Sequence, residues 1–218
     1  MEVSMLKLEH FPVGPLDSVC VIVWNSDQST AVIVDSGGDA DKIIARVKGL
    51  NLKIVAILHT HAHFDHIGAT RELQDNFQCP AYFHEEDRFL LDNLDLQTAM
   101  FGGSQISKPE ISIFRSGDVY HELKVIHTPG HTPGSCCLLG EFECGPVLLS
   151  GDTLFRGGAG RTDLWGGSSK QLELSLDRIS SLGDSTTVIP GHGPTTTVGN
   201  EILTNPYMMR RRCTPKLI

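Results

Sequence analysis

The stretch Ile54-Val55-Ala56-Ile57-Leu58-His59-Thr60-His61-Ala62-His63-Phe64-Asp65-His66 joins a fully apolar run to four histidines and an aspartate. The five apolar residues predict a buried strand, and the polar residues lie at its end, where a rigid sheet can hold functional loops. His61 and His63 are two residues apart, so they project from one face of an extended segment. Because imidazole binds zinc, iron and manganese, we expect these two residues to hold one metal together.

Asp65 and His66 follow at the entrance to a helix that we predict from Asp65 to Phe77. Their side chains therefore point in a different direction from those of the two preceding histidines. This geometry favours a second metal beside the first. The alternative is one metal bound by two of these groups, with the other groups supporting its ligands.

Three residues far away in the sequence complete the predicted ligand set, and each lies in a Gly- or Pro-rich turn after a predicted strand. They are His131 in 128–135, Asp152 in 148–153 and His192 in 189–194. We assign one metal to His61, His63 and His131, and the other to Asp65, His66 and His192. Asp152 is expected to bridge the two metals, because a carboxylate has two oxygens.

Such a site has an open position for water, which is typical of a catalytic site rather than a structural one. A bound metal lowers the pKa of water to about 7, and the resulting hydroxide can attack a carbonyl at neutral pH. We assign Asp65 and Asp152 as catalytic residues. Two divalent ions are expected, with zinc first and iron or manganese as alternatives, since His/Asp sites accept all three.

Short β-branched runs alternate with helical patterns along the chain, which indicates an α/β architecture with helices packed on sheet faces. The two halves are similar in style, so we predict one domain over 1–218, built as an αββα sandwich of two mixed sheets between helices. Strands are predicted at 19–24, 31–34, 54–58, 123–127, 136–139, 147–150 and 186–190, with a hairpin turn at 25–28. Helices are predicted at 39–47, 65–77, 85–98 and 170–182.

The composition excludes several classes of protein. A net charge of −8 repels phosphate backbones, so no nucleic-acid partner is expected. No apolar run approaches the roughly 20 residues of a membrane-spanning helix. The six cysteines form no C-x-x-C pair, which predicts reduced thiols in the cytoplasm. Adjacent Cys136 and Cys137 are expected on opposite faces of a strand, and His59 as a packed, hydrogen-bonded residue rather than a ligand.

With these residues in place, the chain resembles the metallo-β-lactamase superfamily from Asp35 to His192. The resemblance implies the αββα sandwich, a dinuclear site along one edge, and a supporting role for Asp35 beside the metals. Within the superfamily the chain is most similar to the short type II glyoxalases, or hydroxyacylglutathione hydrolases, on the motifs at 130–135, 151–155 and 158–163. This similarity implies hydrolysis of a small-molecule thioester such as S-lactoylglutathione.

The chain departs from that group in two places. Long type II glyoxalases add a C-terminal helical domain that contacts glutathione, whereas only 26 residues follow His192 here. A lysine segment of those enzymes corresponds to Arg161-Thr162-Asp163-Leu164-Trp165. Arg161 is therefore the candidate substrate-binding residue, because guanidinium pairs well with carboxylates.

Two rival functions use the same scaffold. The persulfide dioxygenases resemble the chain around 160–163 and hold one iron with residues that correspond to His61, His131 and Asp152. The loop at 190–194 favours the hydrolase over this alternative. A di-iron electron-transfer module ranks last, because no flavodoxin-like segment is present.

Overall fold

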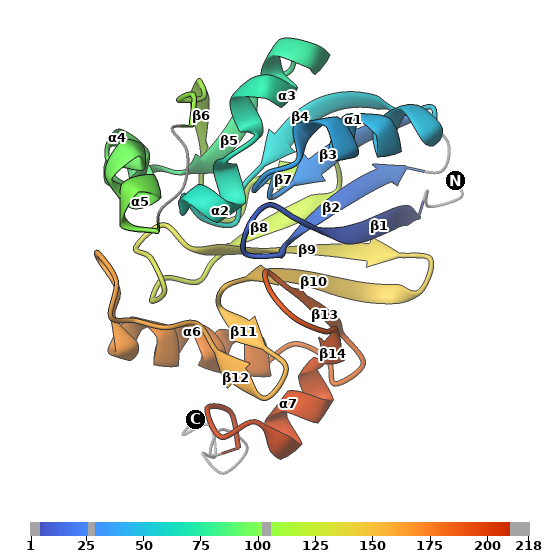
Figure 1. The fold of residues 1–218 in the computed structure, drawn as a ribbon. Coiled ribbons are helices and arrows are strands. Elements are labelled where there is room, and N and C mark those ends of the chain that lie inside the picture. The colour runs from blue at the N-terminus through green and yellow to red at the C-terminus, as the bar shows by residue number, and fades with distance from the viewer. Residues whose placement is uncertain (1–4, 26–28, 102–105, 210–218) are drawn as a thin grey trace.

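The computed structural model describes residues 5–25, 29–101 and 106–209. Two layers of strands lie inside two layers of helices (Figure 1). In the first half, β1 to β3 are antiparallel neighbours and β3 to β6 are parallel neighbours. These strands are β1 Leu6–Val13, β2 Ser18–Asn25, β3 Thr30–Val34, β4 Lys53–Leu58, β5 Ala81–His84 and β6 Ile111–Phe114.

The second half forms the other strand layer around β9 and β10. Its strands are β7 Val119–Tyr120, β8 Leu123–His127, β9 Cys136–Phe142, β10 Gly145–Gly151, β13 Thr187–Pro190 and β14 Thr196–Thr197. A separate ribbon pairs β11 Leu154–Phe155 with β12 Gly158–Ala159. The two predicted layers are joined, since β1 and β9 meet through the single parallel pair Leu6 and Phe142, which makes one continuous 12-stranded mixed sheet.

Helices cover the outer face of each strand layer. On the first half lie α1 Ala40–Gly49, α2 Phe64–Ile67 and α3 Thr70–Phe77, and on the second half lie α6 Ser169–Ser180 and α7 Val198–Thr204. The short segments η1 Glu85–Asp87, α4 Arg88–Asp92 and α5 Leu94–Met100 stand at the edge of the first half (Figure 1). No helix among the described residues is long and apolar enough to cross a membrane.

Separate apolar clusters show that the strands alternate between an inner and an outer face. The cluster between the layers contains Val34 and Leu58 from the first half and Val125 from the second. Cys136 belongs to this inner cluster, whereas Cys137 packs in the outer cluster under α6 and α7, so the predicted opposite orientation is confirmed. The αββα layering follows from this period-two alternation.

Two of the predicted helices are broken. The segment 65–77 contains α2 and α3, separated where the Ala69 N–H donates to the Ser36 carbonyl at 2.8 Å instead of to a carbonyl of α2. The segment 85–98 contains η1, α4 and α5, and the break before α5 lies at Asn93, whose side chain donates to the Phe89 carbonyl at 2.7 Å. The strand and helix predictions elsewhere match within a few residues, and residues 26–28 of the hairpin turn lie outside the described ranges.

Candidate metal centre

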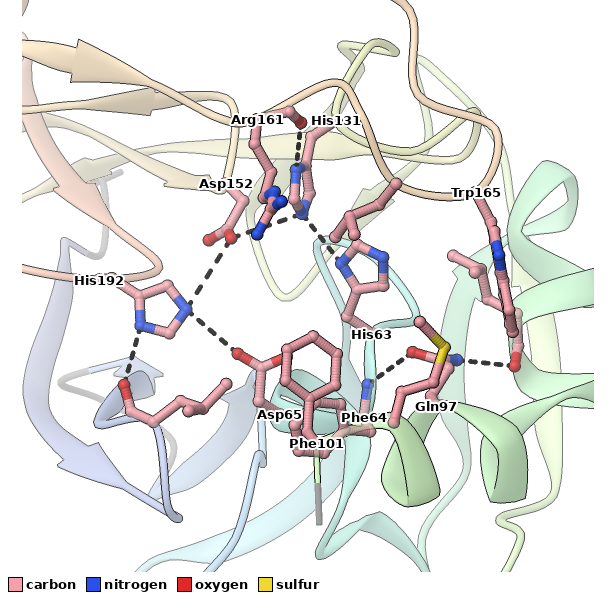
Figure 2. A pocket seen from close by; sticks show the side chains of 14 residues that line it. His63, Phe64, Asp65, Gln97, Phe101, His131, Asp152, Arg161, Trp165 and His192 are labelled. Carbon is pink, nitrogen blue, oxygen red and sulfur yellow. Dashed lines mark hydrogen bonds and ion pairs between the residues drawn. The ribbon is translucent and has the colours of Figure 1, made fainter. Parts of the chain in front are cut away.

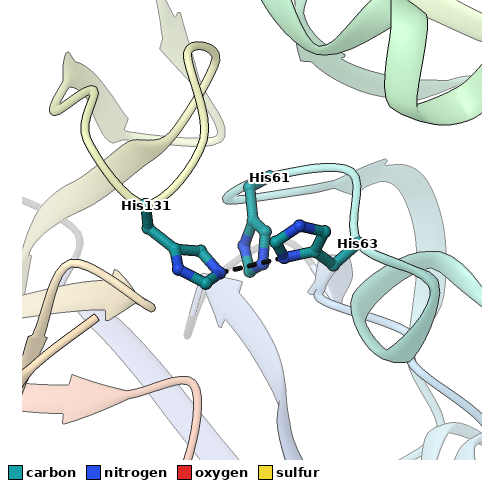
Figure 3. Close-up of side chains that lie close together, drawn as sticks. All are labelled: His61, His63 and His131. Carbon is teal, nitrogen blue, oxygen red and sulfur yellow. Dashed lines mark hydrogen bonds between the residues drawn. The ribbon is translucent and has the colours of Figure 1, made fainter. Parts of the chain in front are cut away.

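The loops that follow four strands bring the predicted ligands to one edge of the molecule. His61 and His63 follow β4, His131 follows β8, Asp152 follows β10 and His192 follows β13. Asp65 and His66 lie in α2, directly after the β4 loop. All seven side chains converge there, as Figures 2 and 3 show for the residues that they label.

The first ligand group consists of His61, His63 and His131. Each offers a ring nitrogen, and these atoms lie within 4.8 Å of one another (Figure 3). His131 Nε2 lies 2.9 Å from His63 Nδ1. Burial lowers the pKa of all three imidazoles, so the rings are neutral near pH 7. Neutral imidazole is the form that binds a metal.

The second ligand group consists of Asp65, His66 and His192. His192 Nε2 lies 3.1 Å from Asp65 Oδ2, and His66 Nε2 lies 3.7 Å from the same oxygen. Burial alone would lower the pKa of His66, but the carboxylates of Asp35, Asp65 and Asp152 outweigh it and raise that pKa to about 10. Burial would raise the pKa of Asp65, but His66 and His192 outweigh it and keep this carboxyl ionised. The group therefore stabilises a cation at its centre.

Asp152 lies between the two groups. Its Oδ1 is 3.5 Å from His66 Nε2, while its Oδ2 is 3.5 Å from His131 Nε2 and 3.8 Å from His192 Nε2. One carboxylate thus faces nitrogens of both groups, which is the position that a bridging ligand requires.

Three of the histidine rings use Nδ1 for a hydrogen bond outside the ligand groups, which directs Nε2 towards the other ligands. His66 Nδ1 donates to Asp35 Oδ2 at 2.9 Å, and His131 Nδ1 donates to the Arg161 carbonyl at 2.8 Å. His192 Nδ1 likewise donates to the Leu16 carbonyl at 3.1 Å. When Nδ1 carries the hydrogen, the lone pair lies on Nε2.

Five buried side-chain polar atoms have no hydrogen-bond partner among the described residues, and three of them belong to predicted ligands: His61 Nε2, His66 Nε2 and Asp152 Oδ1. These three residues also have ligand atoms within 4.8 Å of one another. A buried polar atom without a partner costs about 1–3 kcal/mol. Metal ions would satisfy all three atoms, so the residues present fit a dinuclear metal site.

Asp35 supports the site from behind, at the position that the family resemblance implies. Its carboxylate accepts hydrogen bonds from the backbone N–H of Thr60 at 2.8 Å and from the Thr60 hydroxyl at 2.7 Å, in addition to the bond from His66. His59 is packed nearby, with Nε2 at 3.1 Å from the Thr70 hydroxyl, and burial lowers its pKa to about 4. Its absence from every ligand group agrees with the prediction.

Asp87 is a functional candidate that the sequence analysis missed. Its fully buried carboxylate accepts hydrogen bonds from the Ala62 N–H at 2.9 Å, the Thr132 hydroxyl at 2.8 Å and the Gly134 N–H at 2.7 Å. It therefore ties the loop of His61 and His63 to the loop of His131. Burial raises the pKa of Asp87 to about 6, although the three donors act in the opposite direction.

Gln97 was also missed, and it holds the same loop from another side. Its Oε1 accepts from the Phe64 N–H at 3.1 Å, and its Nε2 donates to the carbonyls of Ala62 at 3.3 Å and Leu90 at 2.8 Å. Neither residue has a sequence signal of its own, because Asp87 ends an acidic triplet and Gln97 lies in a polar helical pattern.

A further group of possible ligands, His84, Glu86 and His127, lies outside this centre. The two imidazole rings stack with centroids 4.0 Å apart and planes only 13° from parallel. A metal binds an imidazole in the plane of the ring, and two stacked rings have no common in-plane point. This arrangement therefore does not form a metal site.

A pocket opens beside the ligands and extends over α5 and the loop at 161–165 (Figure 2). Arg161 lines it, as the sequence analysis expected of a substrate-binding residue. The guanidinium also forms two hydrogen bonds of 2.7 Å with Asp163. Trp165 and Phe101 line the same pocket, with Trp165 on the side away from His192 and Phe101 near Asp65 (Figure 2).

Comparison with known proteins places this geometry in a family. The profile of the metallo-beta-lactamase superfamily matches residues 13–197. A Haemophilus influenzae protein named hydroxyacylglutathione hydrolase GloC is 34% identical, over 93% of this chain and 98% of its own length. A Bacillus subtilis protein named probable metallo-hydrolase YqgX is 36% identical, over 93% and 98%. The crystal structure of TTHA1623 in a di-iron-bound form is similar with a TM-score of 0.85 and 37% identity, over 91% of this chain and 99% of that one.

Proposed function

The chain belongs to the metallo-beta-lactamase superfamily and is a metal-dependent hydrolase of it, and on this basis we propose that it cleaves a thioester such as S-lactoylglutathione. The observation that carries the proposal is the position of Asp152 between two complete ligand groups. Such a site would hold two ions, one at each ligand group, with Asp152 facing both. The relative named hydroxyacylglutathione hydrolase supports the thioester as the bond that is cleaved.

Two divalent ions would supply a nucleophilic water of lowered pKa and would polarise the thioester carbonyl. We propose zinc as the metal, with iron or manganese as alternatives, and the di-iron form of one similar structure keeps iron open. The seven ligands proposed are His61, His63, Asp65, His66, His131, Asp152 and His192.

The side chains of the protein have distinct tasks in this reaction. Asp65 and Asp152 are the acceptors that would orient the attacking water, because each side chain faces the space between the groups. Arg161 holds an oxygen of the substrate with the part of its guanidinium that Asp163 leaves open. The thiolate product leaves without a proton donor, since the pKa of a thiol is only about 8.5.

The test is hydrolysis of S-lactoylglutathione by the full chain loaded with zinc, iron or manganese in turn, followed as thiol release. We expect activity in protein that holds about two ions per chain, and loss of activity in His192→Ala. Absence of thioester hydrolysis with every metal would overturn the proposal. Oxygen consumption on a persulfide by protein with one iron, unchanged in His192→Ala, would favour the dioxygenase instead.

The remaining properties are proposals of the same kind. We propose a small-molecule substrate, because one relative is named hydroxyacylglutathione hydrolase. We also propose a cytoplasmic location, because all five cysteines in the described residues are free and four of them are buried. Reduced thiols are typical of a reducing compartment. Cell fractionation with an antibody to the chain would test the location.

A further inference from the structure

Apolar side chains line much of the pocket beside the ligand groups, and we refer to them as the apolar wall. Four of the large hydrophobic side chains that are exposed in this protein gather around this one pocket: Leu16, Met100, Phe101 and Trp165. Leu90 and Leu164 extend the same wall. Contiguous exposed apolar surface beside a reactive centre marks a ligand-binding surface rather than ordinary scatter.

The Phe101 ring and the backbone that carries Trp165 are held in place by their surroundings. Phe101 stacks on Phe64, with centroids 5.1 Å apart and planes at 30°. After Trp165 the chain turns at Gly166, which has φ +77°, and a Cβ there would lie 2.7 Å from the Pro133 ring. Gly167 N–H donates to the Leu164 carbonyl at 2.9 Å and closes the turn. The wall is therefore preformed next to the loop of His131.

The charges around the pocket do not suit a substrate with several carboxylates. Arg161 is the one cationic side chain, apart from histidines, among the pocket-lining residues that the structure describes. Its Nε and Nη2 are already bonded to Asp163 at 2.7 Å each, so its charge is matched. The other charged lining residues are Asp65 and Asp152, which belong to the ligand groups. Glutathione carries two carboxylates, and this wall offers little to balance them.

We propose that the natural substrate carries an uncharged apolar arm, aryl or alkyl, which packs between Trp165 and Phe101 while its thioester reaches the metal centre. This inference rests on the proposed thioester hydrolysis and narrows its substrate class. The arm belongs either to the acyl group or to the thiol. Burial of the arm against the aromatic wall supplies the binding energy that charge pairing supplies for a glutathione carrier.

Three matched thioesters test the proposal in the metal-loaded full chain. S-lactoylglutathione is the reference. In S-mandeloylglutathione a phenyl ring replaces the methyl group of the acyl side, and in S-lactoyl-2-phenylethanethiol an apolar thiol replaces the charged carrier. We expect kcat/KM for at least one phenyl compound to exceed the reference by about tenfold or more, the range that a hydrophobic pocket provides. The phenyl compound with the higher kcat/KM shows whether the acyl group or the thiol carries the arm. Equal or faster hydrolysis of S-lactoylglutathione would overturn the inference, whereas failure of all three would overturn the proposed function.

Variants of the wall provide the second arm of the test. Trp165→Ala and Phe101→Ala should each lower the ratio of phenyl to reference kcat/KM by about tenfold, mainly through KM. Leu174→Ala is the matched control, because Leu174 is also a large exposed hydrophobic side chain but lies on α6 outside the pocket. An unchanged ratio in both wall variants would contradict the inference.

A binding measurement separates the inference from catalysis. The chain has two tryptophans, so in Trp24→Phe the emission comes from Trp165 alone. We expect a non-hydrolysable phenylethyl thioether to shift this emission to the blue, even in metal-free protein, and S-methylglutathione to leave it unchanged. A shift with S-methylglutathione alone, or no shift with the phenylethyl compound, would contradict the apolar arm.

Discussion

Replacing Asp87 with asparagine should weaken metal binding without removing the fold. Oδ1 of Asp87 accepts from the Gly134 N–H, and Oδ2 accepts from the Ala62 N–H and the Thr132 hydroxyl. In Asp87→Asn one of these oxygens becomes an NH₂ donor that faces another donor. The loops that carry the first ligand group must then separate. Loss of a group that orients metal ligands costs about 10- to 100-fold in metal affinity, and we expect a fall of that size for one of two metals.

The same change has a calculable effect on stability. Burial raises the pKa of Asp87 from 3.8 to about 6, so between these values the folded protein holds a proton that the unfolded chain has released. The ionised carboxylate therefore lowers the free energy of unfolding at pH 7 by about 3 kcal/mol, and this cost is relieved as the pH falls through 6. Asparagine removes the cost but leaves one donor unsatisfied, which costs about 1–3 kcal/mol. We thus expect near-equal stability at pH 7, and a deficit of the variant that grows by about 2 kcal/mol between pH 7 and pH 4.

Two measurements on purified protein check this reasoning. Titration against a chelating dye gives the affinity for each metal, and denaturant unfolding of the metal-free protein at pH 7 and pH 4 gives the stability difference. Asp92→Asn is the control, because Asp92 undergoes the same chemical change in an exposed ion pair with Lys108. Two metals bound with wild-type affinity, together with a pH-independent stability difference, would refute the role assigned to Asp87.

Three further results are expected. His192→Ala should lower kcat/KM for thioester hydrolysis by about 100-fold or more and remove one metal, and unchanged activity would exclude the binuclear reaction. Gly37→Ala should lower the unfolding free energy by about 3 kcal/mol, because the new Cβ would overlap the Asp65 carbonyl oxygen. Gly49→Ala is the control and should not destabilise the protein, because a Cβ there meets no atom within 4 Å. Metal binding should weaken as the pH falls and should release at least one proton at pH 8, because the pKa of His66 is raised to about 10 without metal. Calorimetry in buffers of different ionisation enthalpy measures this proton, and a heat that is independent of the buffer would contradict it.

The layered fold and the convergence of the ligands could be anticipated from local signals. The predicted ligands lie after apolar strands, the three distant ones directly after a glycine, and strand ends of a sandwich meet at one edge. The period-two pattern also placed Cys136 and Cys137 on opposite faces. Such signals are contained within a few neighbouring residues, which is why they can be read without a structure.

The features that escaped prediction depend on distant partners. Asp87 is separated from Ala62 by 25 residues and from Gly134 by 47, and nothing near it in sequence indicates those contacts. At the break between α2 and α3 the Ala69 N–H donates to the Ser36 carbonyl at 2.8 Å, a distant partner, so the helical pattern of 65–77 gave no sign of it. By contrast, helix α7 was missed although it has a local signal. This signal is its N-cap, since the Thr197 side chain accepts from the Asn200 N–H at 3.1 Å.

The pairing of β1 with β9 also lies beyond local reasoning. Strand β1 contains charged residues and a proline, so its pattern is weaker than that of the buried strands. Its single pair with β9 joins Leu6 to Phe142, across most of the chain. The two predicted mixed sheets are joined through this pair into one 12-stranded sheet, while the αββα layering is as predicted.

The metal content of the full chain, purified without chelator, tests the central claim most directly. With Asp152 between two complete ligand groups, we expect about two ions per chain by elemental analysis. We expect about one ion per chain in His131→Ala and also in His192→Ala, because each variant removes a ligand from a different group. A wild-type content near one ion that His192→Ala leaves unchanged would contradict the dinuclear site.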